Sequence, residues 1–244
     1  MKTTILFWIF AGLALDAQTV APLLRMMDQN RNIAQRNDAC YELRGADSRE
    51  ALAAFQRALA DPGLRSCAAR NLRQAGAVEQ LKSTLSDSDP EIRALAAREL
   101  GFLSRPELLE ALSEAAHDSN LLVAVNAFGA LAQYKDTAVL PNLLDLAAGG
   151  GLVGAMALSR AVAFQDPAVL SVARRLMATR DVPLRLGALR AIADLGDRSD
   201  LPGLRELAKK AETAAPAGRG FGLVPALDLS RAAQNAIRQI ESRN

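Results

Sequence analysis

A pattern of about thirty residues recurs along the chain and constrains its fold more than any other feature. The stretches "ADPGLRSCAARNLRQAG" (60–76), "DSDPEIRALAARELG" (87–101) and "RDVPLRLGALRAIADLG" (180–196) each combine an acid, a nearby proline, an apolar residue before arginine, and a closing glycine. One position, called the reference position below, recurs in steps of 28 to 31 residues at Arg36, Arg65, Arg93, Ala124, Ala155 and Arg185. A second ladder with the same period runs through Leu81, Leu109, Leu140, Leu170 and Leu201.

Each period contains two short helical segments separated by a polar turn, for example "AVLPNLLDLAA" and "IRALAARELGFL". Three residues after the reference position the chain carries small residues and one leucine, and seven residues after it carries larger apolar ones. This spacing forms one helical face that permits close helix packing. The +3 set is Ala39, Ala68, Ala96, Ala127, Leu158 and Ala188, and the +7 set is Leu43, Leu72, Leu100, Leu131, Val162 and Ile192.

A single hairpin of such helices cannot bury both faces, so the units are expected to stack. Aromatic residues are only 4% of the chain while alanine and leucine are abundant, a composition that favours helices over strands. We therefore predict an all-α fold, an alpha-alpha superhelix of about seven helix hairpins over residues 18–244. A Pro/Gly/Ala stretch at 213–226 is expected to separate the two helices of the last hairpin.

The acid, proline, arginine and small-residue pattern of 60–76, 87–101 and 180–196 resembles HEAT repeats, particularly the bilin-lyase-like HEAT subgroup, and the chain resembles a bacterial exported HEAT-repeat protein. The resemblance covers nearly the whole chain after residue 17. It implies a solenoid whose second helices line a concave, partner-binding face. It does not by itself imply an activity, because one fold hosts many functions.

The N-terminal segment "MKTTILFWIFAGLALDAQ" contains an apolar run from Ile5 to Leu15 followed by small residues. This run is about half the length of a membrane span, so residues 1–17 are predicted to be a secretory signal, cleaved at Ala14 or Ala17. An uncleaved N-terminal anchor is the alternative. We expect an exported protein, periplasmic or secreted, with no stable membrane span after cleavage.

Only two cysteines occur, Cys40 and Cys67. An even pair in an oxidising compartment raises the question of a disulfide. The two residues occupy positions +4 and +2 of consecutive units, which permits a bridge between neighbouring helices. Two separate buried thiols are the alternative.

The repeated acid and arginine are interpreted as structural. Asp89 is expected to cap a helix with Pro90 at its first position, and Arg93 lies one turn on, at the spacing of an ion pair. Asp61/Arg65 and Asp181/Arg185 repeat this arrangement. Catalytic residues would instead be placed once.

The chain offers little catalytic chemistry. His117 is the only histidine and is expected to end a helix, where it suits the helix dipole. HEAT-like deoxyhypusine hydroxylases carry repeated His-Glu metal motifs, which one histidine cannot supply, and an exported chain has no obvious bilin substrate. We therefore predict no enzyme activity, no metal and no cofactor. Lys+Arg 29 against Asp+Glu 27 gives a net charge of +2, which does not favour nucleic-acid binding.

A candidate working surface is the outward-facing +5 position of the second helices. It reads Tyr41, Arg70, Arg98, Gly129, Arg160 and Arg190, with Val125, Met156 and Leu186 beside it at +1 in the later units. Such a stripe could hold a protein or peptide, especially an acidic one. A solvated face whose arginines pair locally is the alternative. The predicted function is a non-enzymatic protein-interaction scaffold, with a lyase- or hydroxylase-like HEAT enzyme, an enzyme subunit and a structural spacer as alternatives.

Overall fold

The computed structural model describes residues 17–214 and 229–243, and within them the chain is entirely helical. Fourteen α-helices and four short 3-10 segments are present in this part of the chain, with no strand. Consecutive α-helices pack as seven antiparallel hairpins, from α1 with α2 to α13 with α14. The prediction of an all-α, HEAT-like solenoid built from seven hairpins is confirmed.

The hairpins form two compact units, which meet in the sequence between Leu103 and Ser104. The first unit contains α1 (Ala17–Met27), α2 (Ile33–Glu42), α3 (Arg49–Ala58), α4 (Arg65–Gln74), α5 (Val78–Thr84) and α6 (Pro90–Gly101).

The second unit begins with α7 (Leu109–Ala116), α8 (Leu121–Leu131), α9 (Leu140–Gly149) and α10 (Gly151–Ala161). It continues with α11 (Pro167–Leu176), α12 (Val182–Leu195), α13 (Leu201–Ala214) and α14 (Leu229–Ser242). The 3-10 segments are η1 (Pro106–Leu108), η2 (Thr137–Val139), η3 (Val162–Phe164) and η4 (Arg198–Asp200), and all four lie in this unit.

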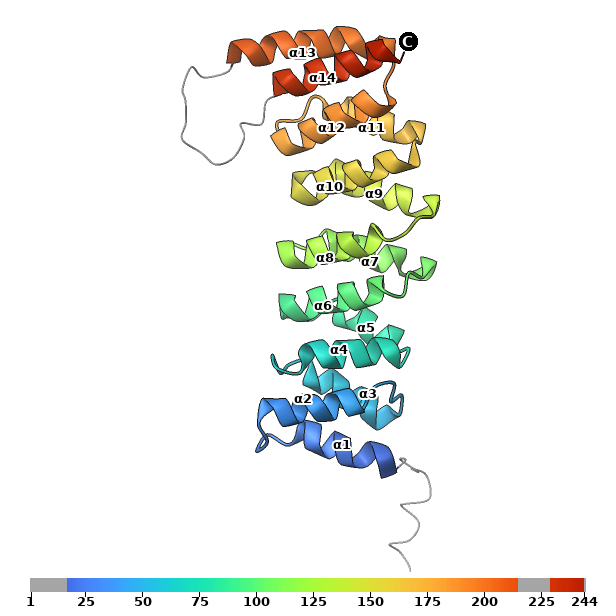
Figure 1. The fold of residues 1–244 in the computed structure, drawn as a ribbon, viewed down its shortest axis with the longest axis vertical. Helices are drawn as coiled ribbons and strands as arrows, with labels where there is room; N and C mark the ends of the chain where they lie inside the picture. Colours follow the sequence, from blue (N-terminus) through green and yellow to red (C-terminus); the bar gives the residue numbers. More distant parts are fainter. Residues whose placement is uncertain (1–16, 215–228, 244) are drawn as a thin grey trace, which may run out of the picture. The chain divides into compact units, whose positions relative to one another are not determined.

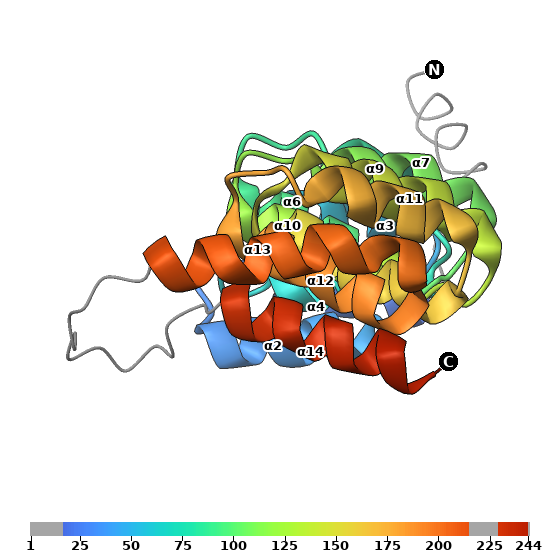
Figure 2. The ribbon, with the colours of Figure 1, turned by 90° about the horizontal axis from the view of Figure 1, so that it is seen from above.

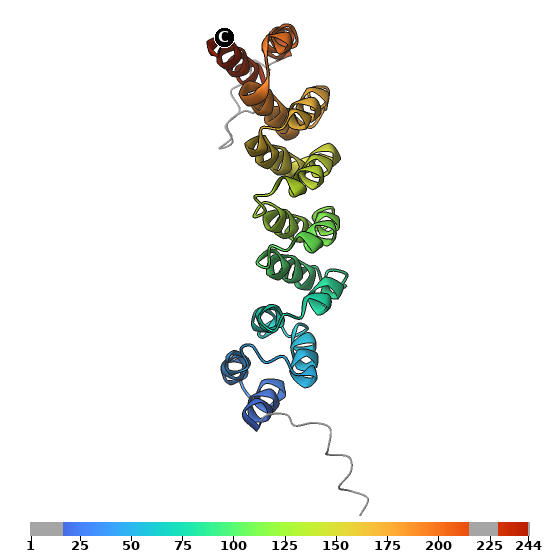
Figure 3. The ribbon, with the colours of Figure 1, turned by 90° about the vertical axis from the view of Figure 1, so that its right-hand side faces the viewer.

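Within the second unit the helices form two columns (Figure 3). The first helices of the hairpins, α7, α9 and α11, lie in one column, and the second helices, α8, α10 and α12, lie in the other. Seen from above, α13 and α14 lie side by side at the end of this unit (Figure 2). The second helices therefore present a series of equivalent faces, one for each repeat.

Local capping chemistry sets where these helices begin. Asp89 adopts an extended conformation before α6, and its carboxylate accepts a hydrogen bond from the Glu91 backbone N–H with Pro90 at the first helical position. Asp181 accepts in the same way from the Leu184 N–H before α12. Both predicted caps are therefore present.

Asp61 departs from this scheme. Its carboxylate accepts from the Gly63 N–H, and α4 begins only at Arg65, with Leu64 as the N-terminal cap. Asp61 therefore stabilises the turn that precedes α4 and does not cap the helix itself.

The buried face of each second helix follows the predicted spacing. All six residues at +3 are buried, and at +7 five of the six are buried. The exception is Val162, which is half-buried because α10 ends at Ala161 and the chain continues as a 3-10 turn. Small side chains at +3 let adjacent hairpins approach closely, which explains the alanine-rich composition.

Two sequence-based predictions concern segments beyond these helices. Residues 1–16 of the predicted signal lie outside the described residues, and Ala17 is the first residue of α1. Of the predicted loop at 213–226, residues 213 and 214 complete α13, and the remainder lies outside the described residues. Among the helices described, none is both long enough and apolar enough to cross a membrane.

Candidate protein-interaction surface

The arginines at the reference position connect one repeat to the next. Arg36 of α2 lies 2.7 Å from the carboxylate of Asp61, which precedes α4. Arg65 of α4 lies 3.3 Å from the carboxylate of Asp89, which caps α6. Both arginine side chains are about nine-tenths buried, so each ion pair is shielded from solvent on its cationic side. The ion pair predicted between Asp61 and Arg65 of one unit is therefore wrong: Asp61, like Asp89, pairs with the arginine of the preceding unit.

Two further units show related contacts. Arg93 donates to the backbone carbonyls of Asp87 and Ser88 at 2.8 and 3.2 Å. Where the reference residue is Ala155, no guanidinium is available, and the carboxylate of Asp181 instead accepts a hydrogen bond of 2.8 Å from the Gly151 N–H. The carboxylate keeps a donor from the preceding unit in either case. These residues are structural, as predicted, although their partners differ.

A disulfide joins α2 and α4 in the first unit. The Sγ atoms of Cys40 and Cys67 are bonded at 2.17 Å, and both residues are buried. Beside them, the buried Asn71 side chain donates to the backbone carbonyl of Cys40 at 2.7 Å. That carbonyl lies in the last turn of α2, where backbone acceptors lack partners within the helix. The bridge and the amide therefore fasten the same helix end to the next repeat.

The predicted arginine stripe has members in both units. In the first unit, Arg70 lies over the ring of the exposed Tyr41, with its guanidinium carbon 5.8 Å from the ring centroid. Arg98 is exposed and lies 3.2 Å from the buried carboxylate of Glu99, which also accepts a 2.8 Å hydrogen bond from Arg73. Arg98 therefore shares a partner inside the protein, as the solvated-face alternative anticipates, while Arg70 offers a cation–π pair at the surface.

In the second unit, Arg160 has a structural role that its sequence position did not reveal. Its Nε atom donates to the carbonyl of Ala132 at 3.0 Å, and a terminal nitrogen donates to the carbonyl of Tyr134 at 2.8 Å. Its guanidinium carbon also lies 4.8 Å from the centroid of the Phe164 ring. Arg160 thus donates to the carbonyls that follow α8, and its side chain is half-buried. The role of Arg160 in binding a partner stays a prediction.

Arg190 of α12 differs from Arg160. Its side chain is exposed, and it forms no ion pair with any residue that the structure describes. Gly129 takes the corresponding position on α8, also exposed, and a Cβ atom added there would have no neighbour within 4 Å. The +5 position of the second unit is therefore glycine on α8 and arginine on α10 and α12.

Next to this row, the second unit exposes apolar side chains on the same helix faces. Leu121 at the start of α8 is 55% exposed, and Leu152 at the start of α10 is 54% exposed. One turn on, at +1, Val125, Met156 and Leu186 are each half-buried, as is Val182 at the start of α12. Residues four apart lie on one face of a helix. We call the set Leu121, Val125, Leu152, Met156, Val182 and Leu186 the apolar field.

Sequence reasoning found only half of this field. The residues at +1 were predicted to lie on this surface, whereas the exposed leucines at −3, Leu121 and Leu152, were not. The first turns of these helices were considered only as sites of capping. The signal was present in the sequence: −3, +1 and +5 are spaced by four residues and share a helical face.

His117 also makes structural contacts. His117 ends α7 as its C-terminal cap, and its Nε2 atom lies 3.0 Å from the carboxylate of Asp145 on α9. Both side chains are exposed. Among the described residues, no group of three or more histidine, cysteine or acidic side chains is placed to hold a metal ion.

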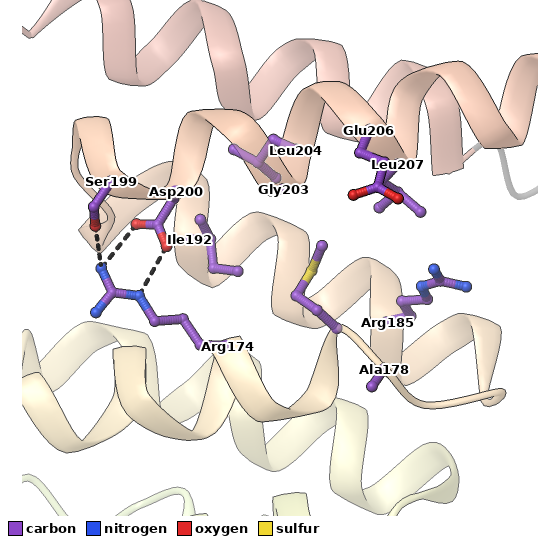
Figure 4. A pocket seen from close by; sticks show the side chains of 11 residues that line it. Arg174, Ala178, Arg185, Ile192, Ser199, Asp200, Gly203, Leu204, Glu206 and Leu207 are labelled. Atoms are coloured by element: carbon purple, nitrogen blue, oxygen red, sulfur yellow. Dashed lines mark hydrogen bonds and ion pairs between the residues drawn. The ribbon is translucent and has the colours of Figure 1, made fainter.

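A hollow of about 430 Å³ lies between α11, α12 and α13 (Figure 4). On one side, Arg174 donates to the carboxylate of Asp200 at 2.8 and 2.9 Å. The hydrogen bond that Arg174 donates to Asp200, more than any other contact, raises the pKa of Arg174, so the guanidinium stays charged and paired. Ile192 and Leu204 supply apolar walls, and the lining contains no histidine or cysteine. This hollow therefore contains the ion pair of Arg174 with Asp200, and its lining also includes the hydroxyl of Ser199 and the carboxylate of Glu206.

A family model supports the fold, and three solved structures show similarity to the chain. Residues 78–150 match the family model described as HEAT repeats. Human deoxyhypusine hydroxylase in complex with glycerol is similar to this chain at 17% identity and a TM-score of 0.39, covering 92% of this chain and 96% of that one. An engineered protein has 18% identity and a TM-score of 0.33, with 92% and 96% covered. A second engineered protein has 19% identity and a TM-score of 0.44, with 93% and 68% covered. No curated protein matches the chain. The match to HEAT repeats and the helix hairpins within each unit agree on a HEAT-like solenoid fold.

Proposed function

We propose that this protein is a non-enzymatic interaction scaffold that binds a protein or peptide partner in an extracytoplasmic compartment. The observation that carries the proposal is the apolar field of the second unit, where leucines more than half exposed recur on α8 and α10. A solvated face would place polar residues at these positions, and contiguous exposed apolar side chains are typical of interaction sites. The repeated aspartates and arginines, by contrast, are engaged in links between repeats.

Two features support the compartment. Disulfides persist in oxidising compartments and are rare in reducing ones, and Cys40 and Cys67 are bonded in this chain. The N-terminal apolar run, Ile5 to Leu15, has the length and the small-residue end of a secretory signal. An exported scaffold accounts for both features together.

Photo-cross-linking in cells tests the scaffold function. A photoreactive residue placed at Leu121 or at Leu152 should cross-link to the same protein, because both positions belong to one field. The matched control is Ser171, an exposed residue on α11 in the other column of helices. If Ser171 yields the same product, or if neither leucine yields one, the scaffold proposal fails.

The compartment is tested on the purified mature protein. Trp8 is the only tryptophan in the chain, so cleavage of the predicted signal should leave a protein whose fluorescence comes from tyrosine alone. N-terminal sequencing should then begin near residue 15 or 18. Tryptophan emission from the extracytoplasmic fraction would contradict cleavage, and recovery of the protein only from the cytoplasm would contradict export.

A further inference from the structure

The apolar field has a spacing that selects the shape of its occupant. It is two side chains wide, since each helix contributes a residue at −3 and another one turn later at +1. It extends across α8, α10 and α12, which are adjacent in one column (Figure 3). Packed helix axes lie about 8–10 Å apart, so equivalent side chains repeat at about that interval along the column.

An α-helix lying across the column matches this interval. Seven residues of a helix span about 10.5 Å, so an apolar stripe that repeats every seven residues would meet each helix of the column in turn. The stripe of an amphipathic helix is also about two side chains wide. An extended strand fits less well, because its side chains on one face repeat at about 7 Å.

Gly129 adds an independent observation. It lies in the middle of α8 at +5, is exposed, and would meet nothing within 4 Å if it carried a Cβ. An interior helical glycine costs about 1 kcal/mol relative to alanine, and neither space nor backbone conformation requires one here. A partner backbone that approaches α8 closely would require it.

Charge defines one edge of the occupant. Arg160 and Arg190 continue the row of Gly129 along the same side of the field. Arg160 keeps its charge while it binds backbone carbonyls, and Arg190 is exposed with no ion pair to a described residue. A partner edge that faces this row is best matched by carboxylates.

The parts of this chain outside the described residues do not supply such an edge. Residues 1–16 contain one acid, Asp16, and residues 215–228 contain one acid, Asp228. Neither segment offers acids at successive heptads. These two segments of the chain therefore do not match the surface.

We infer that the apolar field, Gly129 and the two arginines form a docking site for an amphipathic helix of a partner protein, with an apolar heptad stripe flanked on one edge by acidic residues. This inference rests on the proposed function and specifies its partner. The helix lies across α8, α10 and α12, approaches most closely at Gly129, and directs its acidic edge toward Arg160 and Arg190.

Selection from a library of displayed 21-residue random peptides on the full-length protein tests the chemistry. The selected peptides should carry apolar residues with heptad spacing and Asp or Glu on one edge. A fluorescent copy of a selected peptide should bind at least about tenfold more weakly to Leu152→Glu and to Arg190→Glu, and its affinity for Arg190→Glu should depend less on salt. Binding to Ser171→Glu, on the other column, should be unchanged.

Gly129→Ala gives a readout that a merely structural glycine would not produce. It should raise the melting temperature, because alanine favours the helix, and yet weaken peptide binding by about tenfold. Gly203→Ala on α13 is the matched control, since Gly203 also has open space around its Cβ position. That variant should leave peptide binding unchanged.

Several outcomes would overturn the inference. Selected peptides that are basic or proline-rich, no enrichment at all, or full binding to Leu152→Glu would each reject the amphipathic acidic helix. Self-association that is lost in Leu152→Glu would assign the field to a second copy of this chain. If cross-linking from Leu152 finds a partner but the library selects other chemistry, the scaffold function stands and this inference fails.

Discussion

Removing the disulfide between Cys40 and Cys67 should destabilise the first unit by a predictable amount. The perturbation is the double variant Cys40→Ala/Cys67→Ala. Alanine is preferred to serine because both sites are buried, and a hydroxyl there would need a hydrogen-bond partner. The bond joins α2 to α4 and closes a loop between residues 27 apart in sequence.

The magnitude follows from the loop. In the chain-entropy model, a closed loop of this length restricts the unfolded chain by about 12 cal/mol/K, which is about 3.5 kcal/mol at 25 °C. Loss of the two buried sulfur atoms adds to this cost. Each single variant also breaks the bond, so each should be destabilised about as much as the double variant, and the two single effects should not add.

Hydrogen exchange followed by mass spectrometry is the assay, because stacked repeats need not unfold in a single step. Peptides that cover α2, α3 and α4 should lose protection in the double variant by the factor that corresponds to about 3.5 kcal/mol, several hundredfold. Peptides from α9 to α12 in the second unit should exchange as in the wild type and serve as the internal control. Urea unfolding of oxidised and reduced wild-type protein provides a second comparison.

A specific result would refute this reasoning. If the double variant and the reduced wild type keep the protection of α2 to α4 within about 0.5 kcal/mol of the oxidised protein, the bridge does not restrict the unfolded chain as argued. If protection falls equally in α9 to α12, the effect is not local to the linked repeats.

Three further substitutions test the links between repeats. Asn71→Ala should lower the free energy of unfolding in urea by about 1–3 kcal/mol, because the Cys40 carbonyl in the last turn of α2 loses the 2.7 Å hydrogen bond that the Asn71 amide donates. Burial, and to a lesser extent the nearby acid of η1, raises the pKa of Tyr134, whose hydroxyl donates to the Arg105 carbonyl at 2.8 Å. A raised pKa means that the stabilisation is complete below the unfolded value of about 10 and is lost as pH rises through the folded value. Tyr134→Phe should therefore be less stable than the wild type by about 1 kcal/mol at pH 8, and the difference should shrink above pH 10; a constant difference would contradict the assignment. Asp89→Ala should lower the free energy of unfolding in urea by more than the roughly 1 kcal/mol of a lost helix cap, because the same carboxylate also pairs with Arg65 of the preceding repeat. A loss of only about 1 kcal/mol would show that this ion pair contributes nothing to stability.

The repeat period, the helix hairpins and most helix starts could be predicted from the sequence. The caps at Asp89 and Asp181 and the helix end at His117 depend on contacts between residues two to four apart, which sequence spacing specifies directly. The candidate surface was only partly predictable. The +5 arginines were identified, and local pairing such as that of Arg98 with Glu99 was anticipated, but the carbonyl partners of Arg160 were not.

What the sequence alone determined is the content of each repeat: two short helices, a small-residue packing face and a capped turn. Only the tertiary structure decided which residues meet between repeats. Arg36 and Arg65 pair with the next repeat, and Arg160 binds the carbonyls at the end of the preceding second helix. The physical reason is that a helix fixes the angle between its own side chains. The rotation and shift between stacked hairpins, which bring such distant residues together, depend on how their packed faces fit.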